Sequence, residues 1–187
     1  MIRTYRAGDG PDVRRVVAEA FGDHGPTVAE LVDDLRVTHA RAELVAEEAG
    51  EVAGHVMLSR SWVDARRALV EVLVLSPLSV APDRQGRGVG TALVGAALAE
   101  ARRQRAPAVF LEGSPDYYSR RGFEAATARG FVRPSVRVPE PAFQVAVLDS
   151  HEDWMAGALV YCEPFWTHDC VGLRDPELER IEHMFEE

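Results

Sequence analysis

The residues best suited to chemistry form one glycine-rich segment, Gln85 to Thr91, which reads Gln-Gly-Arg-Gly-Val-Gly-Thr. An apolar stretch rich in β-branched residues, Val70 to Val80, precedes this segment, and a helical pattern begins at Thr91. A strand that joins a helix through glycines leaves the first N–H groups of the helix unpaired and pointing at the loop. Together with the positive end of the helix dipole, these groups form a seat for a phosphate or pyrophosphate.

Three kinds of phosphate-binding loop compete for this segment. A Walker A loop requires a lysine after its last glycine, but Thr91 follows Gly90 directly, which excludes that loop. A dinucleotide fingerprint would have a third glycine where Thr91 stands, and Ala81–Gln85 separates the strand from the loop too loosely for its tight turn. The dinucleotide fingerprint is supported only by Glu112, an acidic residue roughly 20 residues after the loop, where the fingerprint has a ribose-binding carboxylate. A nicotinamide oxidoreductase therefore stays a distant alternative. The third kind of loop is recognised together with a second motif further along the chain.

Composition narrows the class of protein. The 187 residues suffice for one domain with a substantial core, and a hydrophobic fraction of 47% is ordinary for a globular protein. A net charge of -9 argues against a nucleic-acid-binding surface. Cys162 and Cys170 are too few for a disulfide framework, and no residue spacing indicates a metal site. No signal peptide or membrane span is recognisable, so we expect a cytoplasmic protein that binds no membrane.

The elements around the glycine-rich segment predict a mixed sheet. Helical spacing predicts two early helices, after Asp9 and from Thr27, as covers of the sheet. Strands are predicted at 42–47, 52–58, 68–75 and 108–112, with a helix over 91–105. A strand, a crossover helix and a strand make a βαβ unit, so the strands on either side of the helix should be parallel. The fold class is therefore α/β, with a mostly antiparallel sheet, one parallel pair and flanking helices.

Fewer elements are predicted beyond residue 112. A short helix is predicted from Pro115 to Arg121, and strands are predicted at 130–132, 142–148 and 157–161. Residues 1–148 are predicted to form the main domain. Residues 149–187 are predicted as a C-terminal extension, packed on the same domain or at the interface of a possible homodimer, because the tail carries an apolar stripe at helical spacing.

Two motifs together resemble a known family. Gln85-Gly86-Arg87-Gly88-Val89-Gly90 resembles the Q/R-x-x-G-x-G/A pyrophosphate loop of the Gcn5-related N-acetyltransferases (GNAT), with Val80-Ala81-Pro82 as its lead-in. Tyr118-Ser119-Arg120-Arg121-Gly122-Phe123 is similar to the family's Y-x-x-x-G-F motif. Pro77 to Pro82 and the pair Tyr117-Tyr118 also resemble a bacterial subgroup of predicted acetyltransferases, the YhbS-like group. The resemblance implies the GNAT fold, in which the two parallel strands splay apart.

The resemblance implies that acetyl-CoA is the co-substrate and that no metal is used. Backbone N–H groups of the loop would hold the pyrophosphate of the coenzyme, and the strand end would pair with its pantetheine arm. The implied contacts are Leu78, Ser79, Val80, Gln85, Gly86, Arg87, Gly88, Val89, Gly90, Thr91, Ser114 and Tyr117. Ser114 stands where the family often has an asparagine. Arg84 and Arg87 are either solvated or in contact with the coenzyme phosphates.

The resemblance also implies the chemistry. Tyr118 would protonate the departing thiolate, and Glu71 is a weak candidate for the base that accepts the amine proton, with a chain of waters as the alternative. His55 is expected on the exposed face of its hairpin strand. We therefore predict direct transfer of the acetyl group, in a ternary complex, to a primary amine of a small molecule or peptide. The alternative function is a non-catalytic acyl-CoA-binding or regulatory module with the same fold.

Overall fold

The computed structural model describes residues 1–185, so the last two residues of the predicted extension 149–187 lie outside the described part. The chain divides into two compact units. The first unit comprises Met1–Arg60 and Val74–Gln104, and the second comprises Ser61–Leu73 and Arg105–Glu187. Strands β3 (Glu51–Ala65) and β4 (Leu69–Val80) contribute residues to both units. The domain boundary predicted at residue 148 stays a prediction.

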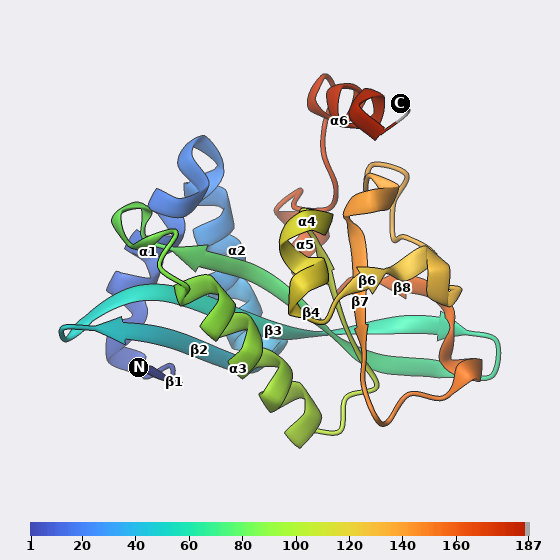
Figure 1. The fold of residues 1–187 in the computed structure, drawn as a ribbon, viewed down its shortest axis with the longest axis horizontal. Helices are drawn as coiled ribbons and strands as arrows, with labels where there is room; N and C mark the ends of the chain where they lie inside the picture. Colours follow the sequence, from blue (N-terminus) through green and yellow to red (C-terminus); the bar gives the residue numbers. More distant parts are fainter. Residues whose placement is uncertain (186–187) are drawn as a thin grey trace. The chain divides into compact units, whose positions relative to one another are not determined.

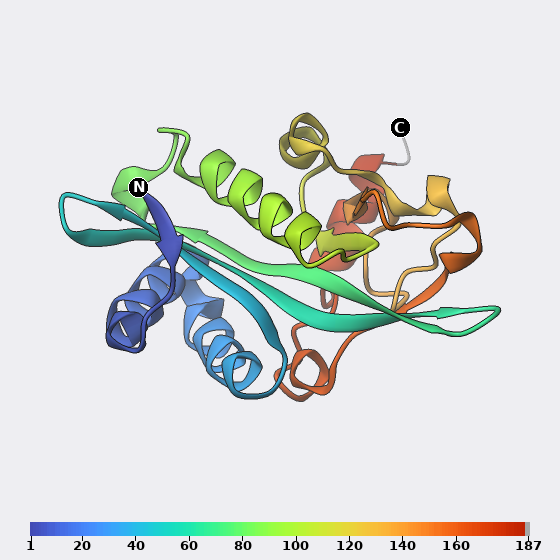
Figure 2. The same cartoon turned by 90° about the horizontal axis from the view of Figure 1, so that it is seen from below.

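The first unit contains two layers of helices around strands. Besides its parts of β3 and β4, it holds β1 (Ile2–Thr4), α1 (Gly10–Phe21), α2 (Gly25–Thr38), β2 (Ala40–Glu48) and α3 (Val89–Arg103). Figure 2 shows α1 and α2 on one face of β2 and β3, and α3 on the opposite face. Strand β2 pairs antiparallel with both β1 and β3. The strands predicted at 42–47 and 52–58 thus form an antiparallel hairpin.

Apolar stripes hold these helices on the strands. Helix α1 buries Val13, Val16 and Val17, which recur at the spacing of one helix face. On the other face, α3 approaches β3 at Gly54, where a Cβ would lie 2.9 Å from Leu93. That distance is closer than packed atoms tolerate, so the absence of a side chain at Gly54 allows α3 to lie against the strand.

The second unit is built on β5. It holds β5 (Ala108–Glu112), α4 (Pro115–Tyr118), β6 (Glu124–Ala125), β7 (Phe143–Val147), β8 (Gly157–Val160), α5 (Glu163–Thr167) and α6 (Glu177–Phe185). Strand β7 lies antiparallel between β5 and β6, and β8 pairs antiparallel with residues 62–65 of β3 (Figure 1). The core is aromatic: the Phe110 ring meets Phe131 edge-on at 4.8 Å and stacks on Phe143 at 5.8 Å.

The strand order is β1-β2-β3-β4-β5-β7-β6, with β8 on β3. Adjacent β4 and β5, which are joined through α3, form the parallel pair in an otherwise mostly antiparallel sheet. The predicted fold class is thus confirmed. Among the helices of residues 1–185, none is long and apolar enough to cross a membrane.

Several element boundaries differ from the sequence prediction. Helix α3 begins at Val89 instead of Thr91, and β4 extends to Val80 instead of ending at Leu75. The strand predicted at 130–132 is wrong, since Val132 makes only an isolated bridge to Ala158. Gly130 adopts φ +79°, a left-handed conformation that interrupts an extended run.

Candidate functional site

The glycine-rich segment connects β4 to α3 in the first unit (Figure 1). A short 3-10 turn, Pro82–Arg84, leads into it. Gly86 and Gly88 then take φ values of +73° and +85°, which other residues adopt at a cost of about 1–2 kcal/mol. A Cβ on either glycine would meet nothing within 4 Å. The backbone conformation, and not a lack of space, therefore requires glycine at both positions.

Helix α3 starts directly behind these glycines. Gly88 is its N-cap residue and offers no side chain to the first-turn N–H groups. The first helical hydrogen bond runs from the Ala92 N–H to the Gly88 carbonyl, at 3.0 Å. Val89 and Gly90 precede that bond, so their N–H groups lie at the positive end of the helix with no side-chain cap. This geometry suits an anion, as the sequence predicts.

The end of β4 is hydrogen-bonded to the glycine-rich loop. The side-chain amide of Gln85 donates to the Val80 carbonyl at 3.1 Å, which ties the loop to the strand. Leu78 and Val80 are partly exposed, whereas Ser79 is 1% exposed. The Ser79 hydroxyl has no hydrogen-bond partner within residues 1–185. Since its side chain points into the protein, Ser79 can offer a ligand only its backbone.

The tyrosine motif lies in the second unit, where α4 follows the turn at Gly113 and Ser114. The rings of Tyr117 and Tyr118 meet edge-on at 4.8 Å, and Phe123 lies 5.7 Å from Tyr118 on its other side. A Cβ on Gly113 would collide with the Tyr118 ring. Tyr118 is therefore held by close packing against the backbone at the end of β5.

The surroundings of Tyr118 keep its phenol neutral. Burial raises the pKa of Tyr118 to about 12, and the neighbouring Tyr117 adds to the effect. The guanidinium of Arg121 lies over the Tyr117 ring, 3.5 Å from its centroid. Ser114 is exposed, and its carbonyl accepts the N–H of Tyr118 at 3.1 Å. A protonated phenol is what a proton donor requires.

Comparison with known proteins decides the family. The family model described as "Acetyltransferase (GNAT) domain" matches residues 1–126, a span that holds both the glycine-rich segment and the tyrosine motif. The chain belongs to the GNAT family. The resemblance seen in the sequence is thereby confirmed.

Three GNAT relatives extend the comparison. An uncharacterized N-acetyltransferase of Escherichia coli K12, YjhQ, is 33% identical over 129 residues, 67% of this chain and 71% of its own length. The crystal structure of the GNAT family N-acetyltransferase YhbS from Escherichia coli, in complex with CoA, has a TM-score of 0.80 at 30% identity, covering 88% of this chain and 91% of that one. A GNAT acetyltransferase from Brucella melitensis in complex with acetyl-CoA has a TM-score of 0.72 at 31% identity, with coverage of 88% and 97%.

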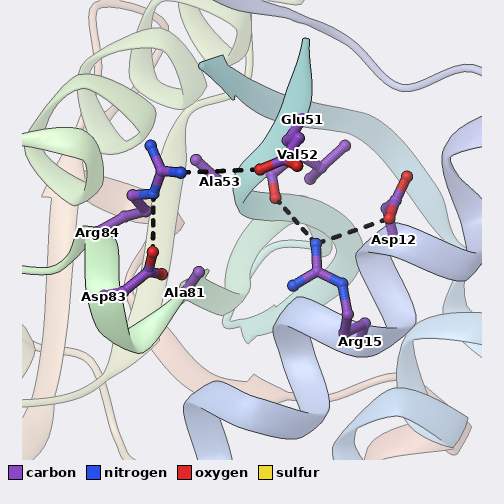
Figure 3. Close-up of a pocket in the computed structure, with 8 residues that line it drawn as sticks. All are labelled: Asp12, Arg15, Glu51, Val52, Ala53, Ala81, Asp83 and Arg84. Atoms are coloured by element: carbon purple, nitrogen blue, oxygen red, sulfur yellow. Dashed lines mark hydrogen bonds and ion pairs between the residues drawn. The ribbon is translucent and has the colours of Figure 1, made fainter. Parts of the chain in front are cut away.

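In this GNAT chain the two arginines near the loop differ. Arg84 donates to Asp83 at 3.0 Å and lies 3.7 Å from Glu51, as Figure 3 shows. It also donates to Glu48 at 3.1 Å. Its guanidinium is thus engaged by carboxylates of the protein. Arg87 is exposed and has no ion-pair partner within residues 1–185. Of the two, Arg87 is the one available to an anion at the loop.

The predicted site residues fall into two groups. The first unit holds Leu78, Ser79, Val80 and the loop from Gln85 to Thr91, which the fold brings together at the start of α3. The second unit holds Glu71, Ser114, Tyr117 and Tyr118. Within that unit, Ser114 and the tyrosines share one turn, while Glu71 is an exposed residue of β4.

Sequence reasoning missed the surroundings of two carboxylates, the buried Glu43 and the half-buried Glu112. In the first unit, Glu43 accepts hydrogen bonds from Arg36 at 2.7 and 2.9 Å and from His55 Nε2 at 2.9 Å. The expectation that His55 is exposed is wrong: it is 0% exposed, because its strand face is the one that α2 covers through Arg36. No local pattern marks this cluster, since 12 residues separate Glu43 from His55.

The second missed carboxylate is Glu112, at the end of β5. Its two oxygens accept hydrogen bonds from the Tyr161 hydroxyl at 2.9 Å and from the Gly172 N–H at 3.1 Å. Burial raises the pKa of Glu112, against the opposing effect of these two donors. Glu112 thus anchors part of the C-terminal region within the second unit.

Proposed function

We propose that this GNAT-family chain transfers the acetyl group of acetyl-CoA to a primary amine of a small molecule or peptide. The observation that carries the proposal is the loop geometry: Gly86 and Gly88 hold left-handed conformations in front of an uncapped helix start. A backbone of this kind binds a pyrophosphate through N–H groups. The CoA and acetyl-CoA in the two solved relatives described above support this choice of anion.

The loop and strand supply the binding of the donor. In the proposal, the N–H groups from Gln85 to Thr91 bind the pyrophosphate, and exposed Arg87 adds a positive charge. The backbone of Leu78 and Val80 pairs with the amides of the pantetheine arm. A backbone N–H of this strand polarises the thioester carbonyl, as an oxyanion hole does. Ser114 and Tyr117 remain proposed contacts.

The chemical step needs a base and an acid. The amine nitrogen attacks the thioester carbon, forming a C–N bond as the C–S bond breaks, within one ternary complex. In this step Tyr118 donates its phenolic proton to the departing sulfur, and its raised pKa keeps that proton in place across the neutral range. The amine proton passes to a water chain or to a carboxylate, for which Glu71 remains the predicted candidate.

Release of free thiol from acetyl-CoA, measured with a panel of amines and peptides, tests the proposal. We expect at least one amine to be acetylated, and Tyr118→Phe to lower kcat about 100-fold or more with little change in acetyl-CoA affinity. Tyr5→Phe, which removes a phenol of the first unit whose ring lies under Arg36, is the matched control and should keep full activity.

Two results would contradict parts of this proposal. A kcat of Tyr118→Phe equal to that of the wild type would remove Tyr118 as the acid. Tight acetyl-CoA binding with no transfer to any amine offered would favour the alternative, a non-catalytic acyl-CoA-binding module.

A further inference from the structure

A cavity of about 290 Å³ lies in the first unit, beside the segment that leads into the glycine-rich loop. It is bounded by the first turns of α1, the start of β3 and residues 81–84. Figure 3 shows Arg15 and Arg84 facing each other across it, with Ala53 and Ala81 between them. The cavity therefore has charged walls and a narrow apolar floor.

Arg15 is held loosely by the protein. Its nearest acceptors are Glu19 at 3.3 Å, the Val52 carbonyl at 3.5 Å and Asp12 at 3.6 Å. Charge-assisted hydrogen bonds of arginine are normally about 2.7–2.9 Å long, and a guanidinium has five N–H donors. Arg15 therefore retains donor capacity on the side that lines the cavity.

Asp12 and Glu51, two carboxylates that line the cavity, are also held loosely. Asp12 meets Arg15 at 3.6 Å and Glu51 meets Arg84 at 3.7 Å, both beyond hydrogen-bond distance. Within residues 1–185 neither carboxylate has a shorter side-chain partner. Arg84, by contrast, is fixed by Asp83 and Glu48 at 3.0 and 3.1 Å, so its wall of the cavity is already ordered.

The charges select the class of ligand. Three carboxylates and two guanidiniums line the cavity. A simple anion would meet an excess of carboxylates, and a simple cation would compete with both guanidiniums. A small molecule with one carboxylate and one ammonium group can pair with loosely held groups of both signs. The volume equals roughly ten water molecules at about 30 Å³ each, which suits a free amino acid.

We propose that this cavity binds a small zwitterion of the α-amino acid class. The ligand carboxylate pairs with Arg15, and the ammonium group lies near Asp12 and Glu51. The alkyl part rests on Ala53 and Ala81.

Calorimetric titration of the full chain with each of the twenty L-α-amino acids tests this proposal without requiring acetyl transfer, so the result is independent of the acetyltransferase proposal. At least one amino acid should bind. Its N-acetyl derivative and its carboxamide, which each lack one charge, should bind at least tenfold more weakly. The proposal is overturned if no amino acid binds or if either derivative binds equally well.

A pair of adjacent arginines provides the matched variants. Arg15→Gln should weaken binding at least tenfold. Arg14→Gln, on the same helix, should bind like the wild type, because Arg14 does not line the cavity and pairs with Asp33 at 2.5 Å. Equal melting temperatures of the two variants would verify that both fold, and equal affinities of the two variants would refute the assignment of Arg15.

Discussion

Two glutamates, the buried Glu43 in the first unit and the half-buried Glu112 in the second, show how the surroundings of a carboxylate set its pKa. Glu43 is 7% exposed and receives hydrogen bonds from two basic side chains, Arg36 and His55. Glu112, at the end of β5, receives its hydrogen bonds from two neutral donors, the hydroxyl of Tyr161 and the N–H of Gly172. Both carboxylates are withdrawn from water, and both have their oxygens occupied.

Their pKa values nevertheless shift in opposite directions. Burial is the largest influence on each and raises the pKa. At Glu43 the hydrogen bonds and charges of His55 and Arg36 outweigh burial, so the pKa falls below its usual range. At Glu112 the two neutral donors and the charge of Arg137 do not outweigh burial, so the pKa is raised. Hydrogen-bonded basic partners thus prevail over burial at Glu43, whereas burial prevails at Glu112.

The largest expected effect is a difference in stability between the two matched variants. Glu43→Gln removes the buried carboxylate that pairs with both Arg36 and His55 and leaves Arg36 only the more exposed Asp33, so we expect a loss of about 3 kcal/mol in the free energy of unfolding. Glu112→Gln removes no charge pair and keeps one acceptor, so we expect a loss of about 1 kcal/mol. Urea denaturation measures both values.

A surface ion pair provides the control for this comparison. Glu47 pairs with Arg3 at 2.7 Å but is 28% exposed, so Glu47→Gln should cost at most about 1 kcal/mol. If Glu112→Gln proved as destabilising as Glu43→Gln, partner charge would not be what distinguishes the two sites.

A smaller effect is expected in the pH dependence of these losses. The pKa of Glu43 is lowered in the fold, so its stabilising contribution is complete above the unfolded pKa of roughly 4.3 and disappears only as pH falls through the folded pKa. The pKa of Glu112 is raised, so the folded chain binds a proton that the unfolded chain has released, and acidification towards roughly pH 4.3 stabilises the wild type at this site.

Unfolding measured in steps from pH 7 to pH 4.5 tests the shift at Glu112. The loss caused by Glu112→Gln should increase as the pH falls, because protonation of the wild-type carboxyl stabilises the fold. A loss that stays constant or decreases over this range would show that the pKa of Glu112 is not raised.

The contrast between local and long-range contacts also explains which parts of the fold and site could be predicted from the sequence. The glycine-rich loop and the Tyr118 motif depend on neighbours within a few residues, since left-handed glycines and a helix start are local features. Glu112 depends on Tyr161 and Gly172, which are 49 and 60 residues away, and no periodicity connects them. His55 was misplaced for the same reason, because strand alternation does not reveal that Arg36 of α2 covers that face.

The central claim is that the glycine-rich loop binds the coenzyme, and calorimetric titration with acetyl-CoA tests it most directly. The wild type should bind with a Kd of roughly 1 μM to 1 mM, the usual range for enzyme substrates. Gly88→Ala should bind about tenfold more weakly, since a φ of +85° costs alanine about 1–2 kcal/mol. Gly95→Ala, within α3 and with open space around it, should bind like the wild type. No binding by the wild type, or equal binding by Gly88→Ala and the wild type, would contradict the account.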